Sequence, residues 1–462
     1  MALQDLAEPL AAIVGPGGVL DRAAIAGRSP GWFADNLHAG LLVRPRTTQE
    51  VSRVMALCHA AGQKVVVHGG LTGLVRGATT TPDDLILSTE RMTAIEEIDP
   101  ANRTMTVQAG VVLQSAQEAA EAAGLFLPLD LAARGSCTIG GNVSTNAGGN
   151  RVIRYGMTRD SVLGLEVVLA DGTVLSSMNR MIKNNAGYDL KHLFVGSEGT
   201  LGIVTRVVLR VREKPASEVT ALAAAPGFAA VAALLKHMDQ GLGGTLSAFE
   251  VMWPEFYAAT AKHVCGGKPP LPHGHPYYIV IDSLGADQVA DRARFEATLG
   301  AAMEMGLVND AVIAESRAQA ETIWAVRDHS EHAETEGGPT ITFDVSLPIG
   351  LMGDYVAAVQ GELDGQGRHP GCFTFGHLGD GNLHFMVPTD ETDADRHAIE
   401  RVVYERLEAL GGSISAEHGI GLEKRDWLEI SRSPAEIAVM RAMKQALDPG
   451  CLLNPGKVLA AL

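Results

Sequence analysis

Three glycine-rich segments between residues 69 and 202 constrain the fold more than any other feature of this 462-residue chain. They are Gly69–Gly73, Gly135–Gly149 and Gly196–Gly202, and each lies next to an apolar run typical of a β-strand. Glycine lets the backbone approach a ligand closely and adopt positive φ, and successive amides of this kind bind anions such as a pyrophosphate. One such loop alone would indicate a tight turn. Three together favour a phosphate-bearing cofactor.

The sequence around the first glycine segment predicts an α/β start. A short apolar run at 41–43 precedes Thr47, which lies three residues before Glu50 in the pattern of a helix capping box. Apolar residues then recur at helical spacing until Gly62, and the buried-strand pattern of 64–68 leads directly into the glycines. No GxGxxG follows this strand and no GxxxxGK(S/T) occurs in the chain, so neither dinucleotide fingerprint applies.

The segments that follow predict a sheet-rich first domain. Strand patterns at 165–169 and 173–175 flank Asp171-Gly172, a typical hairpin turn, and 203–211 predicts a further strand. Lys214-Pro215 and the alanine-rich residues after it mark a change of composition, so we place a domain boundary near residue 215.

Composition and charge exclude several classes of partner. Apolar residues make up 46% and charged residues 20% of the chain, as in ordinary globular proteins, and 37 basic against 54 acidic residues give a formal net charge of −17. Nucleic-acid binding depends on Lys and Arg, so we expect no nucleic-acid partner. A small acidic substrate depends on the local charge and stays compatible.

The position of the first basic residue and the spacing of the cysteines indicate where in the cell the protein is expected. Because the first basic residue is Arg22, we expect neither a secretory nor a mitochondrial leader. The five cysteines form no CxxC pair, which argues against disulfides and a thiolate metal site. No apolar run approaches the roughly 18 residues of a membrane span. We therefore expect a cytoplasmic protein, with any membrane contact peripheral and at the inner face.

Two histidines near residue 380 form a candidate metal site. Asp380-Gly381 predicts a two-residue hairpin turn, and in that register His377 faces His384. Directly opposed residues place their Cβ atoms about 5 Å apart on one face, which lets two imidazoles bind one ion. The alternative is that the two histidines simply pair on a strand face.

The order of the motifs resembles one flavoprotein superfamily over about residues 40–460. The motifs similar to the FAD-binding domain of the vanillyl-alcohol oxidase/PCMH superfamily are Val67–Gly73, Thr138–Asn142, Asn146–Gly149, Gly187–Leu190 and Gly196–Gly202. Two later motifs, Gly376–His384 and Ala416–Gly421, look like C-terminal signatures of its D-2-hydroxyacid dehydrogenase branch. That branch includes D-lactate, D-2-hydroxyglutarate and glycolate dehydrogenases.

The resemblance implies an α+β fold in three parts. A PCMH-type FAD-binding domain of two subdomains would span 1–215, and an α+β substrate or cap domain with an antiparallel sheet would span 216–400. A C-terminal helical segment, 401–462, would return to the FAD domain.

The resemblance also implies which residues contact FAD, with the backbone of the first glycine loop on the pyrophosphate. These residues are Gly69, Gly70, Leu71, Thr72, Gly73, Leu74, Ser136, Thr138, Gly140, Asn142, Thr145, Asn146, Gly149, Glu198, Ile203 and Asn454. Some members bond the flavin covalently through a histidine just after the paired glycines. That position is Leu71 here, so we expect non-covalent FAD.

For catalysis, the resemblance implies a metal site and two further residues. Glu417 would join His377 and His384 as a metal ligand, and this set suits zinc but also manganese or ferrous iron. His418 would be the general base, since histidine titrates near neutrality. Arg327 would bind the substrate carboxylate with its guanidinium fork.

An ordinary structural alternative exists for each of Glu417, His418 and Arg327. Glu417 would otherwise be a surface acid and His418 a structural histidine. Arg327 would otherwise be a solvated helix arginine, close enough to pair with Asp328 or Glu331.

Three positions depart from the 2-hydroxyglutarate branch. Thr342 stands where that branch has a lysine, Glu331 where it has threonine, and Met386 where it has asparagine. Losing a cation and gaining an anion favours a monocarboxylic substrate similar to D-lactate, because a buried unpaired carboxylate is costly. D-2-hydroxyglutarate or D-malate is the alternative, since another arginine such as Arg368 could replace the lysine in space.

The expected reaction is FAD-dependent oxidation of a D-2-hydroxyacid to the 2-oxo acid. Hydride would pass from C2 to flavin N5, with metal-assisted deprotonation by His418. One rival is a flavin-free metallohydrolase using the metal-site residues, which leaves the glycine loops unexplained. Another is a non-enzymatic binding module. The electron acceptor stays open between a quinone, a cytochrome and an electron-transfer flavoprotein, and we expect a homodimer.

Overall fold

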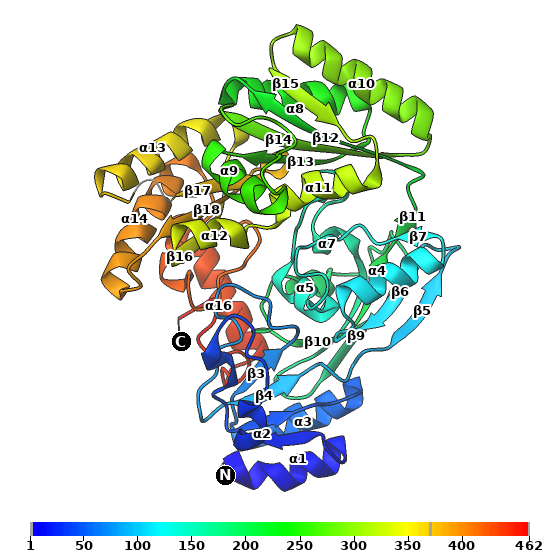
Figure 1. Ribbon diagram of the computed structural model, residues 1–462. Coiled ribbons are helices and arrows are strands. Elements are labelled where there is room, and N and C mark those ends of the chain that lie inside the picture. Colours follow the sequence, from blue (N-terminus) through cyan, green and yellow to red (C-terminus); the bar gives the residue numbers. More distant parts are fainter. Residues whose placement is uncertain (1–2, 369–371, 461–462) are drawn as a thin grey trace. The chain divides into compact units, whose positions relative to one another are not determined.

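The computed structural model describes residues 3–368 and 372–460, apart from the side chains of 334, 336 and 337, and its chain divides into two units (Figure 1). Unit 1 comprises Met1–Gly148, Gly156–Lys214 and Glu417–Leu462. Unit 2 comprises Gly149–Tyr155 and Pro215–Ala416. Both units combine helices with β-sheets, so the expected α+β class is confirmed.

The strands of unit 1 form three sheets within its described residues. The strands are β1 (Val19–Asp21), β2 (Leu41–Val43), β3 (Val65–His68), β4 (Leu85–Ser88), β5 (Ile95–Asp99), β6 (Thr104–Gln108), β7 (Leu125–Phe126), β8 (Val162–Val168), β9 (Val174–Ser177), β10 (Ile203–Arg210) and β11 (Arg212–Glu213). The first sheet has the order β1-β2-β4-β3, with β4 parallel to both of its neighbours. The second is antiparallel, in the order β5-β6-β10-β8-β9, and β7 pairs with β11.

The helices of unit 1 are mostly short. They are η1 (Leu3–Leu6), α1 (Ala7–Val14), α2 (Arg22–Ala26), η2 (Ala34–Leu37), α3 (Thr48–Ala61), α4 (Leu113–Ala122), α5 (Ile139–Thr145), α7 (Thr158–Ser161), η3 (Leu190–Leu193), η6 (Arg425–Trp427), α15 (Leu428–Ser431) and α16 (Pro434–Leu447). The core lies between the sheets and the apolar faces of α1, α3, α4 and α5.

Helix α3 confirms the local prediction of a capped helix. The hydroxyl of Thr47 accepts a hydrogen bond from the backbone N–H of Glu50 at 3.2 Å, and Gly62 ends the helix with φ 65°. The carboxylate of Glu50 accepts from the N–H of Arg46 at 2.7 Å, so the reciprocal half of the capping box reaches one residue further back than expected. Strand β3 then leads into the first glycine segment.

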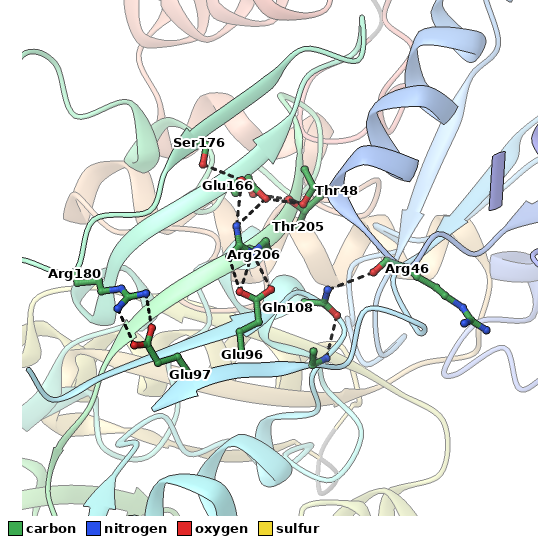
Figure 2. A network of polar contacts seen from close by, with 11 residues as sticks. Arg46, Thr48, Glu96, Glu97, Gln108, Glu166, Ser176, Arg180, Thr205 and Arg206 are labelled. Atoms are coloured by element: carbon green, nitrogen blue, oxygen red, sulfur yellow. Dashed lines mark hydrogen bonds and ion pairs between the residues drawn. The ribbon is translucent and has the colours of Figure 1, made fainter. Parts of the chain in front are cut away.

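A polar network fixes α3 to the second sheet of unit 1, as Figure 2 shows. Glu166 on β8 is 7% exposed and accepts hydrogen bonds from Thr48 at 2.6 Å and Ser176 at 2.8 Å. The guanidinium of Arg206 lies between this carboxylate and that of Glu96, to which Nε donates at 2.9 Å. Because each buried polar group has a partner, the network orients α3 on the sheet at little desolvation cost.

Unit 2 is built on one seven-stranded antiparallel sheet in the order β15-β12-β14-β13-β17-β18-β16. Its strands are β12 (Ser217–Ala225), β13 (Leu246–Met252), β14 (Tyr277–Gly285), β15 (Asp310–Ile313), β16 (Thr340–Ser346), β17 (Phe373–His377) and β18 (Asn382–Pro388). All of these strands lie between residues 217 and 388.

Helices pack on this sheet in separate groups. They are α6 (Val152–Tyr155), α8 (Phe228–Leu242), α9 (Pro254–Val264), α10 (Gln288–Glu304), α11 (Arg317–Asp328), α12 (Glu331–Gly337), η4 (Ile349–Leu351), α13 (Met352–Gly365), η5 (Leu378–Asp380) and α14 (Asp393–Leu410). Helices α8 and α10 run side by side near β12 and β15 (Figure 1). Helices α9 and α11 share an apolar core that includes Phe256, Val326 and Met386.

Other local predictions also agree with the structure. Strands β8 and β9 pair around Asp171-Gly172 as a hairpin, and β10 covers nearly the whole of the predicted strand at 203–211. Among the described residues, no helix is both long and apolar enough to cross a membrane.

Candidate active site

A cavity in unit 1 lies where the three glycine segments meet. Its volume is about 320 Å³. The expected FAD-contacting residues that line it are Gly69, Gly70, Leu71, Thr72, Gly73, Leu74, Thr138, Gly140, Asn142, Thr145, Glu198, Ile203 and Asn454. Ser136 and Asn146 lie outside this lining, and Gly149 belongs to unit 2.

The first glycine segment packs directly on the second. A Cβ atom on Gly70 would lie 2.1 Å from the carbonyl oxygen of Ser136, and one on Gly69 would lie 2.6 Å from Oγ1 of Thr138. Side chains do not fit at these distances, so both positions require glycine. The same Thr138 hydroxyl accepts from the N–H of Gly141 at 3.3 Å and so caps α5.

Asn142 tests whether the cavity suits a polar cofactor. The side chain is 4% exposed and lines the cavity. Its amide nitrogen faces the thiol of Cys137, a weak acceptor, and has no other hydrogen-bond partner among the described residues. A buried N–H donor without a good acceptor costs free energy unless a ligand supplies one. The donor and the glycine cradle fit FAD.

Asn454 joins two of the cavity's segments. Its side-chain oxygen accepts from the backbone N–H of Val67 at 2.9 Å, and its side-chain nitrogen donates to the carbonyl of Glu198 at 2.6 Å. The residue itself has φ 41°, a left-handed conformation that asparagine tolerates better than most residues. The C-terminal segment of the chain thus fixes the end of β3 against the third glycine segment.

Glu198 positions the loop that carries Glu417 and His418. Its two carboxylate oxygens accept from the backbone N–H groups of Ile420 at 2.7 Å and Gly421 at 2.8 Å. Burial raises the pKa of Glu198, although these hydrogen bonds oppose the shift. Glu417 and His418 line the same cavity as the glycine segments.

The hairpin that carries His377 and His384 differs from its predicted register. Strand β17 ends at His377, and a 3₁₀ turn with Gly381 at φ 86° follows, so the predicted two-residue turn is wrong. Phe375, not His377, lies opposite His384. The two histidines stay on one face because the shift is two residues. Their ring centroids are 5.4 Å apart and the rings are nearly perpendicular.

Glu250 on β13 lies directly opposite His377 and contacts two of the expected site residues. Its Oε2 accepts from Nε of Arg327 at 2.8 Å, and its Oε1 lies 2.9 Å from Nδ1 of His377. Burial opposes ionisation, but the charges of His377 and Arg327 outweigh it and hold the pKa of Glu250 below its usual range. Arg327 is 5% exposed, so the alternative of a solvated helix arginine is wrong.

Asp344 on β16 lies directly opposite His384 and is fully buried. Its carboxylate accepts from the side-chain amide of Asn382 at 3.0 Å and from the hydroxyl of Ser415 at 3.0 Å. Ligand atoms of Asp344 and His384 lie within 4.8 Å of one another. Ser415, near the end of unit 2, is thereby held at β16, next to the strand β18 that carries His384.

Two of the positions that depart from the 2-hydroxyglutarate branch form a cross-strand pair. Thr342 lies opposite Met386, on the sheet face that also carries His384. Met386 is 2% exposed and belongs to an apolar cluster with Phe373 and Phe375. This part of the sheet face is apolar.

The other two residues relevant to substrate choice have partners of their own. Glu331 is exposed and lies 2.6 Å from Nδ1 of His329. The guanidinium of Arg368 pairs with Asp395, and this contact lowers the pKa of that carboxyl. Another guanidinium nitrogen donates to the carbonyl of Pro388, at the end of β18 remote from His384. Arg368 is therefore a poor replacement for the missing lysine.

Comparison with known proteins identifies the family. Residues 39–177 match the family model "FAD binding domain", and residues 214–458 match "FAD linked oxidases, C-terminal domain". The chain is 41% identical over 453 residues to a probable mitochondrial D-2-hydroxyglutarate dehydrogenase of Oryza sativa subsp. indica, covering 97% of this chain and 80% of that protein. The chain belongs to the FAD-dependent D-2-hydroxyacid dehydrogenases.

Further relatives of the dehydrogenase carry more than one substrate name. A D-2-hydroxyglutarate dehydrogenase of Xanthomonas citri pv. viticola is 41% identical over 420 residues, covering 90% of this chain and 88% of that protein. A putative mitochondrial D-lactate dehydrogenase of Schizosaccharomyces pombe is 34% identical over 427 residues, covering 90% and 81%. These matches exclude the flavin-free hydrolase and the non-enzymatic module as descriptions of the dehydrogenase.

Solved structures support the PCMH-type fold of the dehydrogenase. The crystal structure of p-cresol methylhydroxylase matches with a TM-score of 0.79 at 16% identity, covering 99% of this chain and 97% of that one. An alkyldihydroxyacetonephosphate synthase matches with a TM-score of 0.74 at 18% identity, covering 98% and 86%. At these identities the likeness shows the fold alone.

Glu250 and Asp344 of the dehydrogenase were not predicted from the sequence. Both are single carboxylates within otherwise apolar or hydroxyl-bearing strands, Leu246–Met252 and Thr340–Ser346. A charged residue is rarely fully buried unless it is paired. A single carboxylate within a buried strand therefore indicates a paired, buried acid, although it does not reveal the partner.

Proposed function

We propose that the dehydrogenase binds FAD non-covalently in the cavity of unit 1 and oxidises a D-2-hydroxy monocarboxylate similar to D-lactate to the 2-oxo acid. The observation that carries the proposal is that His418, the expected base, lines the same cavity as the three glycine segments. Leu71, at the position of the covalent histidine of some relatives, offers no atom for a bond to flavin. FAD supplies the hydride acceptor when bound.

His418 would take the proton of the substrate hydroxyl. The loop that carries it is fixed by the hydrogen bonds from the backbone N–H groups of Ile420 and Gly421 to Glu198. A base positioned in this way contributes about 10²–10⁴-fold to the rate.

Arg327 would bind the substrate carboxylate. Its Nε is committed to Glu250, which leaves other N–H groups of the fork for a ligand. Nη2 lies 3.2 Å from Nε2 of His377, so substrate or metal binding would have to separate these two groups. Glu250 orients both residues from one carboxylate.

A divalent metal would be held by His377, His384 and Glu417. The donor set fits zinc, manganese or ferrous iron, and a metal lowers the pKa of a bound hydroxyl. Oε1 of Glu250 lies 2.9 Å from Nδ1 of His377, and a carboxylate at one ring nitrogen is common in histidines that bind a metal through the other. Ser415 binds Asp344 beside His384, and Glu417 follows two residues later in the chain.

The apolar surroundings of Met386 support a monocarboxylate over a dicarboxylate. Neither Thr342 nor Met386 offers a cation to a second carboxylate, and leaving that group unpaired in an apolar cluster costs several kcal/mol. The second candidate is D-2-hydroxyglutarate, which relatives at 41% identity carry in their names.

An anaerobic bleaching screen tests the proposal. Purified protein is mixed with D-lactate, glycolate, D-malate or D-2-hydroxyglutarate, and the visible flavin absorbance is followed. We expect D-lactate to bleach the flavin fastest, and the L-enantiomer to fail. Fastest bleaching by D-2-hydroxyglutarate would establish the second candidate, and a colourless protein that takes up no FAD would overturn the proposed cofactor site.

A further inference from the structure

Three side chains at the junction of α11 and α12 form a cluster outside the flavin cavity and outside the metal site proposed above. His329 follows the last residue of α11, and Glu331 and His332 lie in the first turn of α12. Each offers a metal-ligating atom, and these atoms all lie within 4.8 Å of one another. His329 and Glu331 are exposed and His332 is half-buried, so an ion can reach them from solvent.

The three side chains are already oriented toward one another. Nδ1 of His329 lies 2.6 Å from Oε1 of Glu331, and the rings of His329 and His332 have centroids 5.7 Å apart. The ring of His332 also stacks on that of His263, from the end of α9, at 4.8 Å and 19°. This stack restricts the rotation of His332, which reduces the entropy lost when an ion is bound.

Two imidazoles and one carboxylate suit a particular class of ion. Zinc binds His nitrogen at about 2.0–2.1 Å and carboxylate oxygen at about 2.0–2.2 Å, so ligand atoms around one ion lie about 3–3.5 Å apart. Small side-chain rotations bring atoms separated by at most 4.8 Å into this range. Calcium and magnesium prefer oxygen ligands alone. We propose that His329, Glu331 and His332 form a second metal site, selective for a borderline transition ion such as Zn²⁺, Co²⁺ or Ni²⁺, with water completing the coordination.

An ion at this site would fix the end of the helix that carries Arg327. Arg327 lies two residues before His329, in the last turn of α11. The stack with His263 connects the same cluster to α9, which packs against α11 through the apolar core. A bound ion would therefore reduce the motion of the helix end that presents Arg327.

The experiment isolates the second site from the one proposed at His384. Full-length flavoprotein carrying His384→Asn is titrated with Co²⁺ alone, and bound ions per chain are counted by equilibrium dialysis, with the Co²⁺ absorption spectrum as a second readout. We expect one ion per chain, and at least about tenfold weaker binding after adding either His332→Ala or Glu331→Gln.

The matched control is His397→Ala, an exposed histidine on α14 whose Nδ1 lies 4.0 Å from Oε2 of Glu400. This variant should bind Co²⁺ as the His384→Asn protein does. Flavin content of each variant verifies folding. The proposal is overturned if Co²⁺ binding is unchanged by His332→Ala and Glu331→Gln, or if His397→Ala weakens it equally, which would indicate non-specific surface binding.

Discussion

Glu250 and Arg327 form a buried ion pair in unit 2, with Oε2 2.8 Å from Nε and side-chain exposures of 1% and 7%. The pair is separated by 77 residues in sequence and links β13 to the last turn of α11. Because the guanidinium is held from one side, its remaining donors face a defined direction. The expected substrate-binding residue is therefore positioned by the fold before substrate arrives.

Replacing Glu250 by Gln should destabilise the protein strongly. The substitution keeps the shape but leaves the positive charge of Arg327 buried without a counter-charge, which costs about 3 kcal/mol or more. Urea unfolding of the two proteins measures this difference in the free energy of unfolding.

The matched control is Glu321→Gln on the same helix. Glu321 pairs with Arg317 at 2.8 Å, but the two side chains are 64% and 92% exposed. An exposed pair of this kind contributes about 0.3–0.5 kcal/mol. Equal destabilisation by the two substitutions would show that the buried pair contributes no more to the free energy of unfolding than the exposed pair.

Substituting Gly70 by Ala should remove most of the bound FAD. The new Cβ would lie 2.1 Å from the carbonyl oxygen of Ser136 and 2.9 Å from Cα of Cys137, and these are backbone atoms that cannot move away cheaply. We expect affinity for FAD to fall about tenfold or more, measured by flavin fluorescence titration of the apoprotein. Gly361→Ala on α13 is the control, because a Cβ there meets nothing within 4 Å and Gly361 does not line the FAD cavity. Similar losses in both variants would contradict the role of close packing at Gly70.

The parts of the fold that could be predicted from sequence are those encoded by neighbouring residues. Helix α3 has its cap and its terminating glycine within the same short stretch, so its limits follow from local rules. The glycine segments were recognisable because close backbone approach and positive φ leave a compositional trace that does not depend on distant partners.

Other features depend on partners that the sequence does not reveal. The contact between Glu250 and His377 spans 127 residues, and nothing near Glu250 indicates it. The predicted register of the hairpin was wrong for a different reason. Asp380-Gly381 is compatible both with a two-residue turn and with the 3₁₀ turn that forms, and burial of the strand residues decides between them.

Lys457 should make stability rise at alkaline pH. Burial lowers the pKa of Lys457 to about 8, while its charge interactions with Asp84 and Asp35 oppose the shift. Between pH 8 and the ordinary lysine pKa of about 10.4, the unfolded chain holds a proton that the folded chain has released, so the free energy of unfolding rises with pH. The contribution amounts to about 3 kcal/mol across this range.

Urea unfolding of Lys457→Met tests this assignment. The variant lacks the titrating group, so its free energy of unfolding minus that of the parent should fall as the pH rises from about 8 to about 10. Replacing the exposed Lys268 by Met serves as the control for the removal of a lysine. A constant difference between Lys457→Met and the parent over this range would contradict the prediction.

His418→Ala should slow flavin reduction by about 10²–10⁴-fold while the protein stays yellow. His418 lines the FAD cavity, but the loop is held by backbone hydrogen bonds to Glu198 that the substitution leaves in place. Stopped-flow absorbance under anaerobic conditions measures the rate. His59→Ala, an exposed histidine on α3, serves as the control. Reduction within a few-fold of the parent rate would remove His418 from proton transfer.

Thr342→Lys should shift the substrate preference toward dicarboxylates. Thr342 lies opposite Met386 on the face that carries His384, so a lysine there would bring a cation to the apolar end of the proposed substrate site. A charge-assisted contact worth about 1.4 kcal/mol raises kcat/KM for D-2-hydroxyglutarate about tenfold. The value for D-lactate should stay equal or fall, because D-lactate has no second carboxylate. Thr322→Lys adds the same charge at an exposed position of α11 and should change neither value. If Thr342→Lys stays yellow and active on D-lactate but gains nothing on D-2-hydroxyglutarate, position 342 does not face the substrate's distal end.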